Sequence, residues 1–279
     1  MTPPEAATAP SGGSLGSQLR QLACDLATRA GALILDGRRS GVGNVDTKST
    51  ATDMVTMYDR ASEDLIVSAL REHRGADGII GEEGTAVSGT SGIDWLIDPI
   101  DGTTNFFYGL PGYAVSIGAR DVEGPLAGAV FVPATNELFS AARGEGASLN
   151  NTPITCSTTT SLSQALLATG FSYQPELRRG HMRRLQYMIG EVRDIRRFGA
   201  AAVDLCNVAA GRVDAYFEEH LAPWDLAAGE LIAREAGCLS GDLSGASVRP
   251  GQVLVANPAL FEPLRALINH ADNLCAAKL

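Results

Sequence analysis

Residues 95–106 read Trp-Leu-Ile-Asp-Pro-Ile-Asp-Gly-Thr-Thr-Asn-Phe, which places two acids just after an apolar run. The run Trp95–Ile97 predicts a buried strand that delivers Asp98 at its end, where the following proline would enforce a turn. Asp101 comes three residues after Asp98, and Gly102-Thr103-Thr104 follows it. We expect the glycine and two threonines to open a helix. Backbone N–H groups at a helix start can bind a phosphate, so this segment is a candidate phosphate site.

Two further acidic sites lie next to predicted elements in the same way. Glu82 follows the apolar pair Ile79-Ile80, which predicts a strand, and Asp225 opens a helix predicted from Asp225 to Ala236. Taken singly, the first is an ordinary solvated turn and the second an ordinary helix cap. Taken together they predict one shared site, in which the repulsion among the carboxylates is offset by a cation. Oxygen ligands of this kind suit Mg²⁺.

The composition excludes several classes of protein. The chain has 279 residues, of which 45% are hydrophobic and 19% charged, so it can bury a sizeable core and is not generally disordered. No apolar stretch approaches the roughly 18 residues of a membrane span. The formal net charge of −10 argues against broad nucleic-acid binding, which depends on Lys and Arg contacts to phosphates. Five scattered cysteines indicate reduced thiols and not a disulfide framework.

The sequence predicts a tail and two subdomains. Residues 1–17 are rich in Pro, Gly, Ser, Ala and Thr and have no basic residue, which predicts a disordered tail, no signal peptide and a cytoplasmic location. Residues 18–150 predict an α+β subdomain, with helices over Leu19–Gly37 and Asp53–Arg71 followed by short strands. Residues 151–279 predict an α/β subdomain. We therefore expect a layered α+β or α/β fold.

The motifs at 95–106 and at Trp224-Asp225-Leu226-Ala227-Ala228-Gly229 resemble those of the inositol monophosphatase family, bacterial type, within the lithium-sensitive, magnesium-dependent phosphatase superfamily. The likeness extends from about residue 19 to 268 and includes residues 53–59 and the Gly-Glu-Glu stretch at 81–83. It implies a layered αβαβα sandwich of the sugar-phosphatase type. It also implies a homodimeric Mg²⁺-dependent phosphomonoesterase, with two to three Mg²⁺ per site, that hydrolyses myo-inositol monophosphate and related polyol phosphates.

The resemblance assigns roles residue by residue. The implied metal ligands are Glu82, Asp98, the carbonyl of Ile100, Asp101 and Asp225. The implied catalytic residues are Thr103 paired with Asp53, which orient and deprotonate the attacking water, together with Glu82 through the third metal. Gly102, Thr103 and Thr104 would hold the phosphate, and Asp101, the N–H of Ala201 and Glu218 would contact the polyol hydroxyls. Lys48 and Ser49 fall in a loop that closes over the metals.

Three alternatives stay open. Glu219-His220 and Pro223 depart from the family pattern at the substrate end, so histidinol-phosphate phosphatase and fructose-1,6-bisphosphatase on the same scaffold remain rivals. An arginine-rich stretch at 176–197 carries seven arginines against three acidic residues. That stretch raises a rival of another class, a regulatory protein that binds RNA or the transcription machinery, although a solvated helix face also accounts for it.

Overall fold

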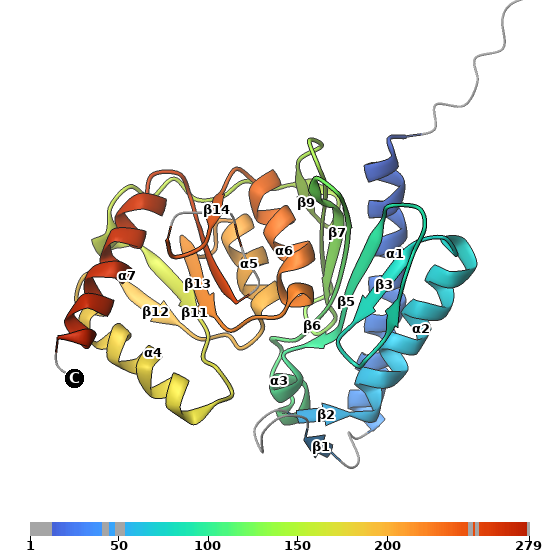
Figure 1. Cartoon of the computed structure of the whole chain (residues 1–279), viewed down its shortest axis with the longest axis horizontal. Helices are drawn as coiled ribbons and strands as arrows, with labels where there is room; N and C mark the ends of the chain where they lie inside the picture. The colour runs from blue at the N-terminus through green and yellow to red at the C-terminus, as the bar shows by residue number, and fades with distance from the viewer. Residues whose placement is uncertain (1–12, 41–44, 48–53, 245–247, 249–250, 278–279) are drawn as a thin grey trace, which may run out of the picture.

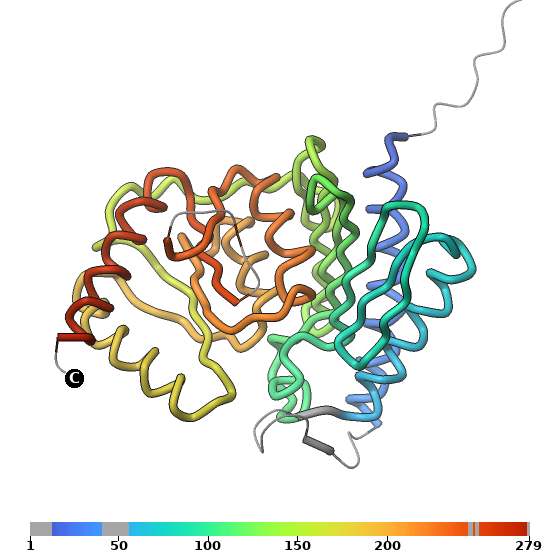
Figure 2. The backbone as a smooth tube through the Cα atoms, in the orientation of Figure 1, coloured from blue at the N-terminus to red at the C-terminus, as the bar shows by residue number. Residues whose placement is uncertain are grey.

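The computed structural model describes residues 13–40, 45–47, 54–244, 248 and 251–277. Two β-sheets stand side by side, and helices cover their outer faces and fill the space between them (Figure 1). The backbone trace follows the same five layers, in the order helices, sheet, helices, sheet, helices (Figure 2). The expected layered αβαβα sandwich of α and β elements is confirmed.

The larger sheet is mostly antiparallel. Its strands are β3 (Gly78–Gly81), β4 (Ala86–Val87), β5 (Asp94–Asp101), β6 (Ala114–Asp121), β7 (Gly124–Val132), β8 (Glu137–Ala142), β9 (Ala147–Leu149) and β10 (Thr152–Pro153). They lie in the order β10-β9-β8-β7-β6-β5-β3-β4, and β3 and β5 run parallel. A separate pair, β1 (Val45–Thr47) and β2 (Met54–Thr56), lies beside α3 (Thr103–Tyr108) at the bottom of Figure 1.

The smaller sheet mixes parallel and antiparallel pairs. Its strands are β11 (Leu166–Thr169), β12 (Asp194–Arg196), β13 (Ala215–Glu219), β14 (Leu239–Gly241) and β15 (Gln252–Ala256). They lie in the order β12-β11-β13-β15-β14, and β11 is parallel to both of its neighbours. A short 3₁₀ turn, η1 (Leu162–Gln164), precedes β11, and the helices α4 (Pro175–Met188) and α7 (Phe261–Ala276) cover the outer face of this sheet.

Two helices cover the outer face of the larger sheet, α1 (Leu15–Ser40) and α2 (Met57–His73). In α1 the residues Leu19, Leu26 and Ile34 recur at helical spacing and are buried against the sheet. Gly31 lets this helix approach β7 closely, because a Cβ on it would lie only 2.2 Å from a ring carbon of Phe131. The N-terminal layer is thus fixed by one amphipathic helix face.

The central helices are α5 (Ala201–Ala209) and α6 (Pro223–Glu235). One buried cluster contains Val130 and Phe139 from the larger sheet, Leu205 from α5, Ile232 from α6 and Val255 from the smaller sheet. Because both sheets pack on the same two helices, a single core joins the two halves of the chain.

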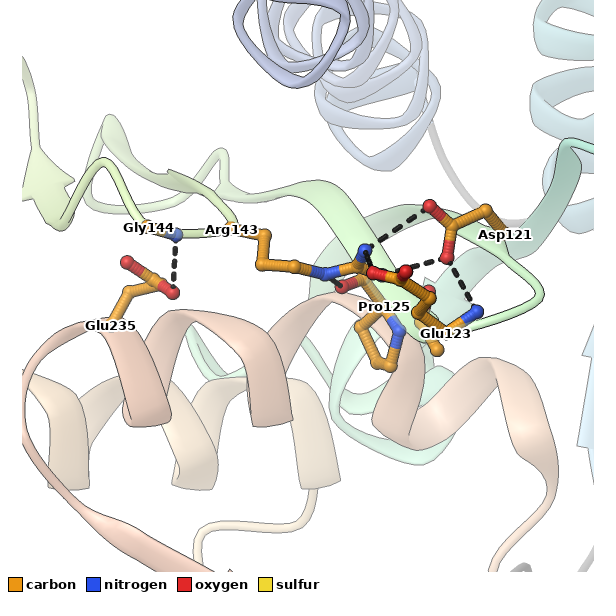
Figure 3. A network of polar contacts seen from close by, with 7 residues as sticks. Asp121, Glu123, Pro125, Arg143, Gly144 and Glu235 are labelled. Carbon is orange, nitrogen blue, oxygen red and sulfur yellow. Dashed lines mark hydrogen bonds and ion pairs between the residues drawn. The ribbon is translucent and has the colours of Figure 1, made fainter.

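An arginine links the end of strand β8 to the β6–β7 hairpin, close to the end of α6 (Figure 3). Arg143, just after β8, donates to both oxygens of Asp121 at the β6–β7 hairpin and to the carbonyl of Pro125. Next to it, Glu235 at the end of α6 accepts hydrogen bonds of 2.9 Å from the backbone N–H groups of Gly144 and Gly146. These contacts attach the far end of α6 to the sheet.

Three expected element boundaries are wrong. Helix α1 begins at Leu15, inside the segment 1–17 predicted as a tail. Helix α2 begins at Met57 and not at residue 53, because Thr56 caps it and Met54–Thr56 form a strand. Strand β5 does not end at Asp98 but continues through the proline to Asp101, with a shift of register in between.

No helix in the described part of the chain is both long and apolar enough to cross a membrane.

Candidate active site

A cavity of about 370 Å³ opens where β5, β13 and the starts of α3, α5 and α6 meet. Most of the residues to which the sequence assigned a role line it: Glu82, Asp98, Ile100, Asp101, Gly102, Thr103, Ala201, Glu218 and Asp225. Thr104 is half-buried in α3 and is not among the lining residues. Lys48, Ser49 and Asp53 lie outside the described residues.

An irregularity in β5 brings two of the acids to the same cavity. In a regular strand, side chains three positions apart point to opposite faces of the sheet. Asp98 pairs with Ser116 of β6 and Asp101 with Ala114, so the register shifts by one residue between them. The N–H of Ile100 donates to Asp98 Oδ1 at 3.1 Å, which stabilises this bend. Pro99 fits here because its nitrogen has no hydrogen to give to the ladder.

Burial and neighbouring negative charges raise the pKa of Asp98, Asp101 and Asp225 in the cavity. Asp98 is only 2% exposed, and burial, followed by the negative charges of Glu82, Asp101 and Asp225, raises its pKa well above the ordinary value. Burial and the charge of Asp101 raise the pKa of Asp225 in the same way. Burial also raises the pKa of Asp101 to about 7, although backbone N–H bonds lower it in part. Among the described lining residues Arg197 is the one Arg or Lys, so the chain itself supplies little positive charge.

The donor set fits a hard divalent cation such as Mg²⁺. Its oxygens come from the carboxylates of Glu82, Asp98, Asp101 and Asp225 and from the carbonyl of Ile100. In the described residues, however, no group of three or more His, Cys, Asp or Glu side chains is already arranged as a metal site. The acids therefore surround a common space without forming a closed cage.

Among the described residues, the acid beside Thr103 is Asp59, to which the sequence analysis gave no role; Asp53, which it paired with Thr103, lies outside the described residues. The Thr103 hydroxyl lies 3.2 Å from Asp59 Oδ1 and 3.0 Å from the carbonyl oxygen of Ile100. Asp59 is fully buried, and its other oxygen accepts bonds from the N–H and hydroxyl of Thr56 at 2.7 and 2.6 Å. The spacing Thr56-x-x-Asp59 at the start of an apolar-periodic helix is a capping-box signal that could have found it.

Gly102 shapes the loop between the acids and α3. Its φ of 86° lies in the left-handed region, and a Cβ there would come within 2.8 Å of the Gly112 carbonyl oxygen. Glycine is therefore required at this position. The backbone N–H groups of the first turn of α3 have no intrahelical partner.

Two of the acids that line the cavity, Asp101 and Glu218, accept hydrogen bonds from specific donors. Asp101 accepts hydrogen bonds from the N–H groups of Ala201 at 3.2 Å and Ala202 at 2.6 Å, so the Ala201 N–H already has a partner within the protein. Glu218 accepts a 2.6 Å bond from the hydroxyl of Tyr216, and burial raises its pKa. Gly170 leaves room for that carboxylate, because a Cβ there would lie 1.8 Å from Glu218 Oε2.

The chain is similar to known proteins in both sequence and fold. An inositol-1-monophosphatase named SuhB from Mycobacterium tuberculosis is 41% identical over 281 residues, covering 92% of this chain and 96% of the relative. A protein named Nus factor SuhB from Vibrio cholerae is 42% identical over 228 residues, covering 80% and 84%. The crystal structure of the extragenic suppressor protein suhB from Bartonella henselae superposes with a TM-score of 0.85 at 33% identity, covering 90% of this chain and 98% of that one.

Residues 16–273 match the family model described as the inositol monophosphatase family. Since that match covers most of the chain and the similar sequences and solved structures agree with it, the protein belongs to the inositol monophosphatase family.

Proposed function

We propose that the chain is a Mg²⁺-dependent phosphomonoesterase that hydrolyses myo-inositol monophosphate and related polyol phosphates to the free alcohol and phosphate. The observation that carries this proposal is the gathering of four acids around one cavity that also contains Gly102 and Thr103. A relative with 41% identity is named an inositol-1-monophosphatase, which supports the same substrate.

Bound Mg²⁺ would polarise the phosphoryl oxygens, lower the pKa of a water molecule and neutralise the leaving alkoxide. Glu82, Asp98, Asp101, Asp225 and the carbonyl of Ile100 would hold two to three such ions.

Residues of the chain itself accept the proton of the attacking water and bind the alcohol portion of the substrate. The hydroxyl of Thr103 accepts a hydrogen bond from the attacking water while it donates its own proton toward Asp59, 3.2 Å away. A threonine alone is too weak a base, and the buried carboxylate supplies the basicity. Gly102, Thr103 and Thr104 would hold the phosphate through their N–H groups. Asp101 and Glu218 would accept hydrogen bonds from the hydroxyl groups of the polyol.

Phosphate release from a panel of polyol, sugar, histidinol and nucleotide phosphates, with and without Mg²⁺, tests the proposal. We expect Mg²⁺-dependent turnover that favours myo-inositol 1-phosphate. A strong preference for histidinol phosphate or fructose 1,6-bisphosphate would assign the scaffold to one of those rivals. Absence of turnover on every ester would refute the proposed phosphatase activity.

A regulatory role is a second candidate, because a relative from Vibrio cholerae is named a Nus factor. Against RNA binding, much of the arginine-rich stretch is neutralised within the chain: Arg179 pairs with Glu176, Arg184 with Glu219 and Asp272, and Arg196 with Asp194. If RNA or partner binding survives Asp98→Asn, the regulatory role is favoured. If the same variant also loses phosphatase turnover, both the regulatory role and the enzymatic function remain supported.

We also propose a homodimer in a reducing, cytoplasmic compartment. The five cysteines are free. Three large hydrophobic side chains that could form a dimer interface are exposed: Tyr108, Leu110 and Phe198. The side-chain amide of Asn105 links their two segments, because it donates hydrogen bonds to the carbonyl oxygens of Gly112 and Phe198. Light scattering of the purified chain tests the dimer, and a monomer at micromolar concentration would exclude it.

A further inference from the structure

A second cavity, of about 280 Å³, lies where the C-terminal ends of α1 and α3 meet (Figure 1). We call it the arginine cavity. No described residue lines both this cavity and the one that contains Asp98. Its lining includes two residues from the last turn of α1, three that follow α3 and one just before β6: Arg38, Arg39, Gly109, Leu110, Pro111 and Tyr113.

The guanidinium group of Arg38 has no acceptor within the described part of the chain. Its Nε is buried and makes no hydrogen bond there, and no described carboxylate forms an ion pair with the group. An arginine near a helix C-terminus ordinarily donates to the last carbonyl groups of the helix. The carbonyls of Phe106 and Asn105 in α3 instead accept from the N–H groups of Gly109 and Leu110, at 3.2 and 2.9 Å. A buried donor without an acceptor costs stability, which points to an acceptor from outside the chain.

A glycine makes room for this guanidinium. Gly109 has a φ of 74°, in the left-handed region, and a Cβ there would lie 2.3 Å from Nη2 of Arg38. A side chain at position 109 would therefore collide with the arginine. The close approach of Arg38 to the end of α3 depends on this glycine.

Tyr113 adds a hydroxyl group to the same cavity. Its side chain is 3% exposed, and its ring packs edge-on against Phe106 of α3, with 5.3 Å between ring centroids. Burial raises the pKa of Tyr113, and the positive charges of Arg38 and Arg39 lower it only in part. The hydroxyl is thus within range of both guanidinium groups and stays protonated, so it can donate a hydrogen bond.

The charge of the arginine cavity favours an anion. Its described lining contains two arginines and no acid, the reverse of the cavity around Asp98. Arg39 pairs with Asp36 at 3.4 Å, but both side chains are more than two-thirds exposed, at 71% and 77%, so that pair is weak. The C-terminal ends of α1 and α3 oppose an anion, each with roughly half a negative charge. Two full positive charges outweigh them.

We propose that the arginine cavity is an oxyanion site that binds inorganic phosphate or the phosphoryl group of a small monoester. A phosphate presents three or more acceptor oxygens, which match the three donor groups, and a guanidinium group binds two of them at once. Leu110 and Pro111 provide an apolar wall for the alcohol portion of an ester. Binding here requires neither Mg²⁺ nor turnover, so the proposal goes beyond the phosphatase function.

The test is calorimetric titration of the purified protein with inorganic phosphate, in EDTA and at constant ionic strength. EDTA removes Mg²⁺, and the acids around Asp98 then repel phosphate from the other cavity. Glycerol 2-phosphate, titrated in the same way, reports binding of an ester. The variants are Arg38→Gln, which removes the guanidinium group, and Tyr113→Phe, which removes only the hydroxyl. Arg29→Gln is the matched control, because Arg29 lies on the same helix and pairs in solvent with Asp25 at 3.2 Å.

We expect one phosphate per chain, with a Kd in the millimolar range or tighter. Arg38→Gln should weaken binding at least about tenfold, as for the loss of a charge-assisted pair of hydrogen bonds. Tyr113→Phe should weaken it about threefold to tenfold, and Arg29→Gln less than about twofold. Tighter binding of glycerol 2-phosphate than of phosphate would identify an ester as the ligand, and the reverse order would identify the free anion.

Absence of phosphate binding to the wild-type protein in EDTA would overturn the oxyanion site. Equal affinities in the wild type, Arg38→Gln and Tyr113→Phe would also overturn it, because the anion would then bind elsewhere. Light scattering of the same samples tests one alternative occupant. If Arg38→Gln lowers the mass of the particle and the wild type binds no phosphate, an acid of a second copy of the chain fills the cavity and the proposal is wrong.

Discussion

Acids lie beside both ends of strand β5, but only the acids near its start have positively charged partners. Near the start of the strand, the carboxylate of Asp77 accepts hydrogen bonds from Arg74, Ser91 and the Trp95 indole N–H. At the other end, Asp98 and Asp101 face further acids across the cavity. Burial alone would raise the pKa of Asp77, but the three donors outweigh it and lower that pKa, whereas the pKa of Asp98 rises.

The contrast separates an acid that stabilises the fold, Asp77, from an acid available for metal binding and catalysis, Asp98. Buried carboxylates that face one another without a positively charged partner cost stability, and a bound cation would offset that repulsion. The same strand thus serves as a structural anchor at one end and as a reactive site at the other.

Asp98→Asn should produce the largest change. Loss of the central carboxylate removes several kcal/mol of charge stabilisation, so kcat/KM on myo-inositol 1-phosphate should fall about a thousandfold. The matched control is Asp94→Asn at the other end of the strand, where the acid pairs with Arg120 and both side chains are 43% exposed. Comparable losses in the two variants would abolish the contrast between the ends of β5.

Thr103→Val should come next. It removes the hydroxyl beside Asp59 at nearly constant volume, and we expect kcat to fall about a hundredfold, within the usual contribution of a positioned base. Thr103→Ser keeps the hydroxyl and should recover most of the rate. If the serine variant is as slow as the valine variant, the methyl group and not the hydroxyl matters.

Asp77→Asn should change stability and not chemistry. Losing a buried charged acceptor should lower the free energy of unfolding by about 3 kcal/mol in urea titrations, with kcat unchanged. Because the folded-state pKa of Asp77 is lowered, its contribution is present above pH 4 or so and is lost as the pH falls through the folded value. The loss of stability in acid should therefore be shallower in the variant than in the wild type.

Magnesium should stabilise the wild-type chain through the acidic end of β5. At a concentration about 100 times its dissociation constant, Mg²⁺ should add about 2.7 kcal/mol to the free energy of unfolding. Thermal unfolding with Mg²⁺ or EDTA measures this, and the difference should disappear in Asp98→Asn but persist in Asp94→Asn. A shift that survives Asp98→Asn would place the cation elsewhere.

The smallest effect is expected away from the strand ends. Glu235→Gln weakens the acceptor of the Gly144 and Gly146 N–H groups and should cost about 1 kcal/mol of stability. Activity should remain within about twofold, because the α6 terminus that carries Asp225 is at the opposite end of the helix. A large loss of Mg²⁺-dependent activity would show that this anchor also positions Asp225.

Much of the acidic end of the site was predictable from local sequence. Glu82, Asp98, Asp101 and Asp225 each lie beside a short apolar run or a helix start, and such signals are encoded within a few residues. The strand boundary was not predictable, because the proline after Asp98 is typical of a turn and the pairing with β6 converts it into an irregular strand. Asp59 was missed because the resemblance was read as assigning the acid to Asp53, and only the folded structure shows which acid contacts Thr103, 44 residues further along the chain.

The sequence by itself determined the alternation of helices and strands, the placement of acids beside strand ends and helix starts, and the helix that opens after Gly102. Tertiary structure alone decided that Asp59 contacts Thr103 and that a register shift brings the side chains of Asp98 and Asp101 to the same cavity. It also decided that the rings of Phe171, His181 and His220 stack. The reason is physical. Backbone preferences and turns depend on neighbouring residues, whereas contacts between distant side chains depend on how two sheets pack across the same pair of central helices.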